Sequence, residues 1–266
     1  MGARKPKSEL RMRVFAGPNG SGKSTIINAV RKYKVKDIPL DFGIYVNADD
    51  ILQNLLKNKF KFSDYRIETN DKEFQSVVLK SGLINKDFPG TKFNSSYQFT
   101  KNSIRLKDLK DKNANEHIAQ LIADFLREKL LSERKKFSFE TVFSHESKLD
   151  IMQRAKDAGY KVYLYFVSTE TPEINIDRVG IRVKKGEHNV PPDKITKRYY
   201  RSHNLLYEAV KLSYQSIFFD NSKTGEDFKL FAQLKTIKGK KNWIRYDEKI
   251  FPEWFVKYYL KRINNC

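Results

Sequence analysis

The hydrophobic residues of this chain gather in short runs that alternate with longer amphipathic stretches. The short runs are rich in β-branched and aromatic residues, and several are apolar at successive positions, which is typical of strands buried on both faces of a parallel sheet. The runs predict strands at Met12–Ala16, Ile44–Asn47, Lys136–Glu140, Lys161–Val167 and Ser216–Asp220.

The amphipathic stretches predict helices. Between Ile118 and Leu130, apolar residues recur every three or four positions, which places one apolar stripe on a helix. Ser147 and Gly159 are residue types that favour the first and last ends of a helix, and Thr171-Pro172 favours the start of another. Besides the helix that starts at Thr171-Pro172, the predicted helices are Ser24–Tyr33, Asp49–Lys57, Asn115–Leu131, Ser147–Ala158 and Asp193–Ser213. Strands alternating with helices predict an α/β fold with a parallel sheet of about five strands flanked by helices.

Two segments interrupt this alternation. Phe60–Ala114 is polar, rich in Asn, Lys and Phe, and contains the turn Phe88-Pro89-Gly90, so we interpret it as an insertion without sheet. Lys223–Cys266 is basic and ends in an aromatic stretch that predicts a helix opened by Pro252. We therefore expect one domain over residues 1–222 with an insertion at about 60–114, and a basic extension over 223–266 packed on the same domain.

The composition narrows the class of protein. With 39% hydrophobic residues the chain can form a core, and its longest apolar run, Val162–Val167, is far below the roughly 20 residues of a membrane span. The segment Met1–Arg13 lacks the apolar centre of a signal peptide, and the single cysteine, Cys266, excludes a disulfide framework. These features favour a cytoplasmic protein with no membrane association.

The charge is strongly positive, with 52 Lys and Arg against 32 Asp and Glu and a formal net charge of +20. Such an excess favours polyanionic partners such as nucleic acid, a nucleotide, an acidic protein or an anionic membrane surface. A lysine-rich surface that serves only solubility explains it equally well.

The sharpest motif is GPNGSGKS, which fits the phosphate-loop pattern G-x-x-x-x-G-K-[ST] between a predicted strand and a predicted helix. Glycines let successive backbone N–H groups point at one phosphate, and the helix N-terminus adds partial positive charge. Lys23 would reach the β- and γ-phosphates, and the Ser24 hydroxyl would bind Mg²⁺. The motif predicts a nucleoside triphosphate site made of Gly17, Pro18, Asn19, Gly20, Ser21, Gly22, Lys23, Ser24 and Thr25.

The reaction is best interpreted as phosphoryl transfer to a small molecule. The third predicted strand ends in Glu140 rather than in the Asp of motor ATPases, and no Asn-Lys-x-Asp guanine signature is present. A kinase needs a carboxylate near the γ-phosphate and cations that neutralise the moving phosphoryl group.

The second predicted strand supplies a candidate carboxylate. It runs into Asn47, Asp49 and Asp50, at the edge of a parallel sheet where ligands bind. Asp49 could accept the proton of an acceptor hydroxyl, and Asp50 is the weaker candidate. Alternatively, one of these residues only caps the helix that begins there.

The helix after Thr171-Pro172 supplies candidate cations. Arg178 and Arg182 are four residues apart and so share one helix face, where two guanidiniums could clamp a phosphoryl group. The neighbouring charges also fit a simple solvated face. His188 is a further candidate, although a single loop histidine is more often structural.

Several blocks together resemble the zeta-toxin family of P-loop kinases. They are AGPNGSGKST at Ala16–Thr25, VNADDI at Val46–Ile51, FSFET at Phe137–Thr141, AKDAGYKVYLYFV at Ala155–Val167, the long block at Ile174–Leu206 and FFDNS at Phe218–Ser222. The resemblance implies a P-loop kinase-like fold and ATP-dependent phosphorylation of the 3′-hydroxyl of UDP-N-acetylglucosamine. It also implies a small antitoxin as partner of many such enzymes.

Carried to this sequence, the resemblance implies Lys23 as the phosphate-loop lysine, Asp49 as the catalytic aspartate and Glu140 as the strand-end glutamate. The two lid arginines fall on Arg178 and Arg182. The chain departs from the family pattern in its long Phe60–Ala114 segment, in Gly186-Glu187-His188 and in Thr141-Val142. The acceptor therefore stays open. A kinase of nucleic-acid 5′-hydroxyl ends or of another nucleotide, and a non-catalytic ATP-controlled binding module, are the alternatives.

Overall fold

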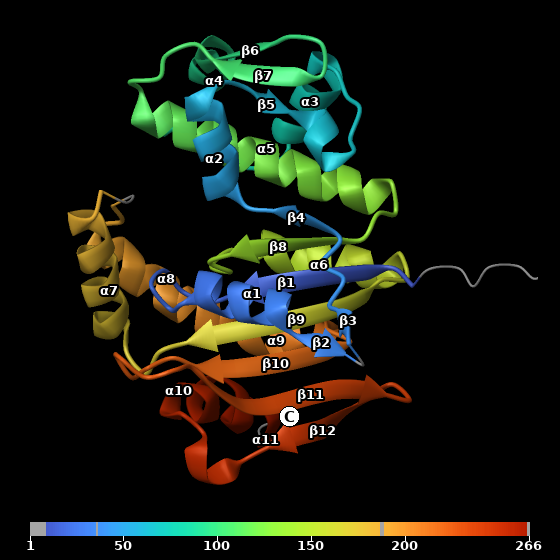
Figure 1. The fold of residues 1–266 in the computed structure, drawn as a ribbon, viewed down its shortest axis with the longest axis vertical. Coiled ribbons are helices and arrows are strands. Elements are labelled where there is room, and N and C mark those ends of the chain that lie inside the picture. Colours follow the sequence, from blue (N-terminus) through green and yellow to red (C-terminus); the bar gives the residue numbers. More distant parts are fainter. Residues whose placement is uncertain (1–8, 36, 187–188, 265–266) are drawn as a thin grey trace, which may run out of the picture. The chain divides into compact units, whose positions relative to one another are not determined.

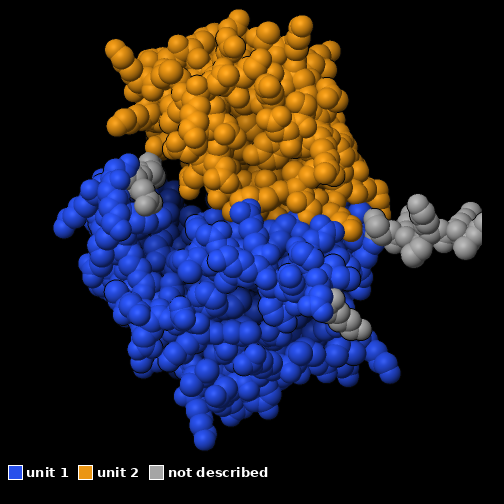
Figure 2. Space-filling model, viewed as in Figure 1, with its two compact units in different colours: residues 1–42, 140–266 blue, residues 43–139 orange. Residues whose placement is uncertain are grey.

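The computed structural model describes residues 9–35, 37–186 and 189–264. The chain divides into two compact units, one formed by residues 1–42 with 140–266 and the other by residues 43–139 (Figure 2).

A five-strand array, in the order β12-β11-β10-β9-β1, forms the centre of the first unit (Figure 1). These strands are β1 (Arg11–Ala16), β9 (Lys161–Ser168), β10 (Gln215–Asp220), β11 (Lys229–Ile237) and β12 (Lys240–Tyr246). β9 runs parallel to both β1 and β10, whereas β11 and β12 join as antiparallel strands. Val14 and Leu164 are completely buried, as expected for strands between two layers.

Helices surround these strands. They are α1 (Lys23–Lys32), α6 (Ser147–Asp157), α7 (Pro172–Lys184), α8 (Pro192–Asn204) and α9 (Leu206–Leu212), with a two-stranded hairpin of β2 (Lys34–Val35) and β3 (Ile38–Pro39). After β12 the chain forms η2 (Glu248–Ile250), α10 (Glu253–Phe255), the π-helical turn η3 (Val256–Leu260) and α11 (Lys261–Asn264). Phe255 of this terminal segment packs on Phe218 of β10 and Phe231 of β11, with ring centroids 4.8 and 5.0 Å apart.

The second unit combines a parallel strand pair with a small antiparallel sheet. β4 (Ile44–Val46) pairs in parallel with residues 137–139 of β8 (Phe137–Thr141), the part of that strand that belongs to this unit. The helices are α2 (Ala48–Lys57), α3 (Asp71–Val78), α4 (Gly90–Ser96) and the long α5 (Lys112–Ser132), with the short turn η1 (Phe62–Tyr65). The small sheet has the order β5 (Phe60–Lys61), β7 (Ser103–Leu106) and β6 (Tyr97–Phe99).

The expectation that Phe60–Ala114 contains no sheet is therefore wrong. The three strands are two to four residues long, too short to show an alternating pattern in the sequence. Their stability comes from aromatic packing, because Phe62 contacts Phe74 and Phe125 at centroid distances of 6.0 and 5.3 Å.

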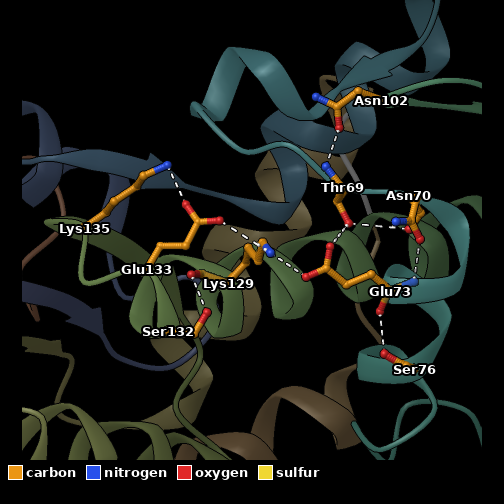
Figure 3. A network of polar contacts seen from close by, with 9 residues as sticks. All are labelled: Thr69, Asn70, Glu73, Ser76, Asn102, Lys129, Ser132, Glu133 and Lys135. Atoms are coloured by element: carbon orange, nitrogen blue, oxygen red, sulfur yellow. Dashed lines mark hydrogen bonds and ion pairs between the residues drawn. The ribbon is translucent and has the colours of Figure 1, made fainter.

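A polar network fixes this segment to the end of α5 (Figure 3). The Thr69 hydroxyl donates to the Glu73 carboxylate at 2.7 Å, and the same carboxylate pairs with Lys129. The hydrogen bond to Glu73 raises the pKa of Lys129, and Glu133 lies 3.5 Å from the same ammonium group. The network thus connects Thr69 and Glu73 of the segment with the end of α5, more than 50 positions later in the sequence.

The predicted α/β fold with a mostly parallel sheet is confirmed. The five predicted strands correspond to β1, β4, β8, β9 and β10. The predicted helices are also present, with Asp193–Ser213 divided at Leu205 into α8 and α9. The N-cap of α6 is Glu146 rather than the predicted Ser147, and Gly159 follows the helix with φ of +82° as predicted. In the described part of the chain, every helix is too short or too polar to span a membrane.

Candidate active site

The phosphate loop lies in the first unit, between β1 and α1. Gly20 and Gly22 have φ values of +76° and +95°, a left-handed backbone that glycine adopts without strain. A Cβ atom on Gly20 would lie 2.6 Å from the Asn175 carbonyl oxygen, and one on Gly22 would lie 2.2 Å from Nδ2 of Asn221. Both the backbone angles and the close contacts therefore require glycine.

Helix α1 begins directly after this loop. Its N-cap is Gly22, which has no side chain to bond the first N–H groups, and its first turn contains no acidic residue. A helix N-terminus of this kind favours an anion, because the first N–H groups lack partners within the helix and carry partial positive charge.

Lys23 and Glu140 are brought together in the first unit. The Lys23 ammonium donates a 2.9 Å hydrogen bond to the Pro18 carbonyl and lies 3.9 Å from the Glu140 carboxylate. Lys23 is only 8% exposed, so its charge is held inside the loop. Ser24 and Thr25, which follow it, are exposed in the first turn of α1.

Asp49 lies in the second unit, in the first turn of α2. The N-cap is Asn47, whose side-chain oxygen accepts hydrogen bonds from the backbone N–H groups of Asp49 and Asp50 at 2.7 and 3.4 Å. The carboxylates of Asp49 and Asp50 are therefore not the caps of this helix, and both residues are exposed. The alternative in which one of them serves as the N-cap is wrong.

The two arginines of α7 have different surroundings. Arg178 is half-buried and donates to the carbonyl oxygens of Asn221 at 2.7 Å and Lys223 at 3.3 Å. Burial lowers the pKa of Arg178. Arg182, one turn later, is exposed. His188 and Glu187 lie outside the described residues.

Two further residues contact the phosphate loop, and sequence reasoning gave neither of them a role. The Asn221 amide donates to the Ser21 carbonyl at 2.9 Å, and the Arg198 guanidinium of α8 donates to the Asn19 side chain at 3.4 Å. Burial, followed by repulsion from Arg201, lowers the pKa of Arg198. Both residues fall inside sequence blocks that resemble the kinase family. Their place in these blocks is the one feature of the sequence that could have pointed to them.

The described residues contain no group of three or more His, Cys, Asp or Glu side chains that could hold a metal ion. An ion at this site would therefore depend on a hydroxyl such as that of Ser24 together with oxygen atoms of a bound nucleotide. Mg²⁺ fits this arrangement, because it usually retains waters and binds through few protein ligands and substrate phosphates.

Comparison with known proteins supports the fold. No protein-family model matches the chain. An uncharacterized protein of Haemophilus influenzae is 35% identical over 63 residues, which are 24% of this chain and 45% of that protein. A chain in the crystal structure of AvrRxo1-ORF1:AvrRxo1-ORF2 with sulphate ions aligns with a TM-score of 0.51 and 17% identity, over 94% of this chain and 63% of that chain.

A chain from the PezAT chromosomal toxin–antitoxin system of Streptococcus pneumoniae aligns with a TM-score of 0.49 and 14% identity, over 97% of this chain and 81% of that chain. Our chain thus spans less than two thirds of the AvrRxo1-ORF1:AvrRxo1-ORF2 chain and matches less than half of the Haemophilus protein. The likeness to the AvrRxo1-ORF1:AvrRxo1-ORF2 chain is one of fold. It confirms the α/β fold with a mostly parallel sheet flanked by helices that the sequence predicts.

Proposed function

We propose that the protein is a phosphotransferase that moves the γ-phosphoryl group of ATP to an alcohol oxygen of a small molecule. The observation that carries this proposal is the loop Gly17–Thr25, whose glycines adopt the angles of a phosphate cradle while Lys23 is held inside it beside Glu140. Phosphoryl transfer depends mainly on positioning and on neutralising charge, and these residues are suited to both tasks.

The roles of the residues follow from their chemistry. The N–H groups of the loop and the Lys23 ammonium bind the β- and γ-phosphates, and Mg²⁺ held by the Ser24 hydroxyl and phosphate oxygens would neutralise charge on the triphosphate. Glu140 orients Lys23 or a water molecule.

Three arginines are assigned to stabilise the transferring phosphoryl group. Arg178, Arg182 and Arg198 offset the charge that develops as the bond to ADP breaks. Arg198 is supported by its hydrogen bond to Asn19 of the loop. Arg178 would exchange its bonds to the Asn221 and Lys223 carbonyls for phosphate oxygens.

Asp49 is assigned as the general base. It accepts the proton of the acceptor hydroxyl, the hydroxyl oxygen bonds to the γ-phosphorus, and ADP leaves with the electrons of the broken P–O bond. The exposed carboxylate of Asp49 supports this role, because Asn47 is the N-cap of α2 and the Asp49 carboxylate is not needed to cap the helix.

We propose a nucleotide sugar as acceptor, and UDP-N-acetylglucosamine with its 3′-hydroxyl as the first compound to test. The resemblance of the sequence to the zeta-toxin family supports this choice. A small antitoxin protein is the corresponding proposed partner.

The net charge of +20 favours one second candidate, a kinase of nucleic-acid 5′-hydroxyl ends. Incubation with ATP, Mg²⁺ and a panel of acceptors separates the candidates. The panel contains UDP-N-acetylglucosamine, other nucleotide sugars, dinucleotides and 5′-hydroxyl RNA. Phosphorylated UDP-N-acetylglucosamine would support the first proposal, and labelled RNA with strong salt dependence would support the second. ATP binding without turnover on any acceptor would indicate a binding module and contradict both.

A further inference from the structure

A cavity of about 490 Å³ lies in the first unit. Its walls come from the segment between β9 and α7 with the first residues of α7, from α8, and from the terminal segment with α10 and η3. None of Gly17–Thr25, Arg178 and Arg198 lines it. Its volume is within the usual range of small-molecule sites, about 300–1,000 Å³.

Aromatic side chains form much of the wall. They are Tyr199, Tyr200, Phe251, Trp254 and Tyr258. Tyr199 is fixed, because its hydroxyl lies 2.8 Å from the carbonyl oxygens of both Thr169 and Glu170. Tyr200 packs edge-on against Tyr199 with ring centroids 5.3 Å apart and is 44% exposed. One edge of this aromatic wall is therefore accessible from solvent.

The imidazole of His203 supports the wall from inside the protein. Its ring lies 4.2 Å from that of Tyr199, 5.4 Å from that of Trp254 and 5.0 Å from that of Tyr258. His203 is completely buried, and burial lowers its pKa to about 4. The ring is therefore neutral at physiological pH and adds no positive charge behind the cavity.

Three carboxylates accompany the aromatic rings. Glu170, Glu173 and Glu253 line the cavity together with two lysines, Lys257 and Lys261. Acidic side chains therefore outnumber basic ones in the cavity wall. In the whole chain, by contrast, Lys and Arg outnumber Asp and Glu by 52 to 32. The backbone N–H groups of Trp254 and Glu253 donate to Glu170, which holds its carboxylate at the start of α10. The Lys257 ammonium lies over the Tyr258 ring, 5.2 Å from its centroid.

We propose that this cavity binds an organic ammonium ion, with the accessible rings of Tyr200 and Tyr258 beside the cationic head, the buried Trp254 behind them and the carboxylates at its rim. Aromatic rings attract cations through their negative faces, and groups of such rings recognise quaternary and alkylated ammonium groups. The place of the Lys257 ammonium over Tyr258 illustrates this attraction within the same cavity. The cation could be a free amine or an alkylated lysine of another protein.

The test uses Trp254 as the reporter. The chain has two tryptophans, so the Trp243→Phe variant leaves Trp254 alone to report on the cavity. Its fluorescence is titrated with choline and, as a neutral control of the same shape, with 3,3-dimethylbutan-1-ol. A peptide carrying trimethyllysine and the same peptide with unmodified lysine distinguish a protein-borne cation from a free one.

We expect saturable quenching by choline or by the trimethyllysine peptide, at least about tenfold tighter than by the neutral control. Tyr200→Leu and Glu253→Gln should each weaken binding about threefold or more. Tyr33→Leu, which alters an exposed tyrosine outside the cavity, should leave it unchanged. Because Tyr200 is partly exposed, its replacement preserves the core, and circular dichroism checks the fold.

Equal binding of choline and the neutral alcohol would overturn the proposal, since the cavity would then be merely apolar. Displacement of choline by ATP without Mg²⁺ would also overturn it, because the cavity would then hold the nucleotide base. Quenching that never saturates is the third contradictory result. All three results come from binding measurements. They can therefore be obtained whether or not the protein has the proposed kinase activity.

Discussion

The side-chain amide of Asn221 donates a 2.9 Å hydrogen bond to the backbone carbonyl of Ser21, while the backbone carbonyl of Asn221 accepts a 2.7 Å bond from Arg178. Asn221 directly follows β10, so the end of that strand holds the phosphate loop on one side and a candidate lid arginine on the other. One residue outside the recognised motif thus fixes the positions of two parts of the candidate site.

Replacing Asn221 by Ala should weaken ATP binding about three- to tenfold, because one hydrogen bond contributes about 1 kcal/mol. Isothermal titration calorimetry measures the change. Asn242→Ala is the control, since the Asn242 amide donates within its own strand, to the Lys240 carbonyl. An Asn221→Ala protein with wild-type affinity would contradict the role of Asn221.

Gly22→Ala should abolish ATP binding. The added methyl group would meet the Asn221 amide at 2.2 Å on a backbone with φ of +95°. The double variant Gly22→Ala/Asn221→Ala removes the close contact but retains the unfavourable backbone angle, so it should recover little affinity. Full recovery would show that the contact alone requires glycine at this position.

Lys23→Ala should reduce turnover by at least about a thousandfold, because the variant loses the charge that neutralises the transferring group. The Lys23 ammonium lies 3.9 Å from Glu140, so the fold should tolerate its removal with a small change in melting temperature. Turnover with the best acceptor and a thermal melt measure the two effects. Near-normal turnover would exclude Lys23 from phosphate handling.

Asp49→Asn should abolish product formation while ATP binding persists, because an amide cannot accept the hydroxyl proton. Asp50→Asn is the matched control, as both residues are exposed and both bond the same Asn47 oxygen through their backbone N–H groups. Equal activity in the two variants would reject Asp49 as the base.

Arg198→Ala should lower kcat/KM for ATP about tenfold or more, as expected for loss of a charged hydrogen bond. Arg198→Lys should recover only part of the loss, because lysine lacks the planar fork of a guanidinium. Arg201→Ala, an exposed residue three positions later, provides the control. If the Arg198 and Arg201 variants behave alike, Arg198 contributes only to the general positive charge.

The buried His203 should make stability depend on pH. Burial lowers its pKa from 6.5 to about 4, so between these values the unfolded chain binds more protons than the folded one. The free energy of unfolding should therefore fall as the pH is lowered from about 6.5 to about 4, by roughly 3 kcal/mol from this residue.

Urea denaturation across this pH range measures the slope, with His203→Gln as the comparison. Carboxylates also contribute to acid destabilisation, so the difference between the two slopes is the informative quantity. Parallel slopes in the two proteins would mean that His203 has the same pKa in the folded and unfolded chain.

The sequence predicts those parts of the molecule whose constraints are local. The continuous apolar runs predict β1, β9 and β10, because a strand covered on both faces needs no alternation. The glycines of the phosphate loop are likewise imposed by their own backbone angles. The short strands within Phe60–Ala114 could not be predicted, because two to four residues are too few to show an alternating pattern.

Other parts of the site depend on contacts between distant positions. Arg198 meets Asn19 across 179 positions of the sequence, and Asn221 meets Ser21 across 200. Sequence patterns such as helical or strand periodicity do not predict contacts over such separations. Arg178 is half-buried and Arg182 is exposed, and their four-residue spacing does not predict this difference. The carbonyl oxygens that accept from Arg178 come from the segment after β10.

The antiparallel pairing of β11 with β10 limits how far the chain can be shortened. A protein ending at residue 222 would lose β11 and leave the hydrogen-bonding edge of β10 open from Gln215 to Asp220. It would also uncover Phe218, a completely buried side chain that packs on Phe231 and Phe255. Open apolar edges promote intermolecular strand pairing, so the shortened protein should aggregate before its phosphate loop could be assayed.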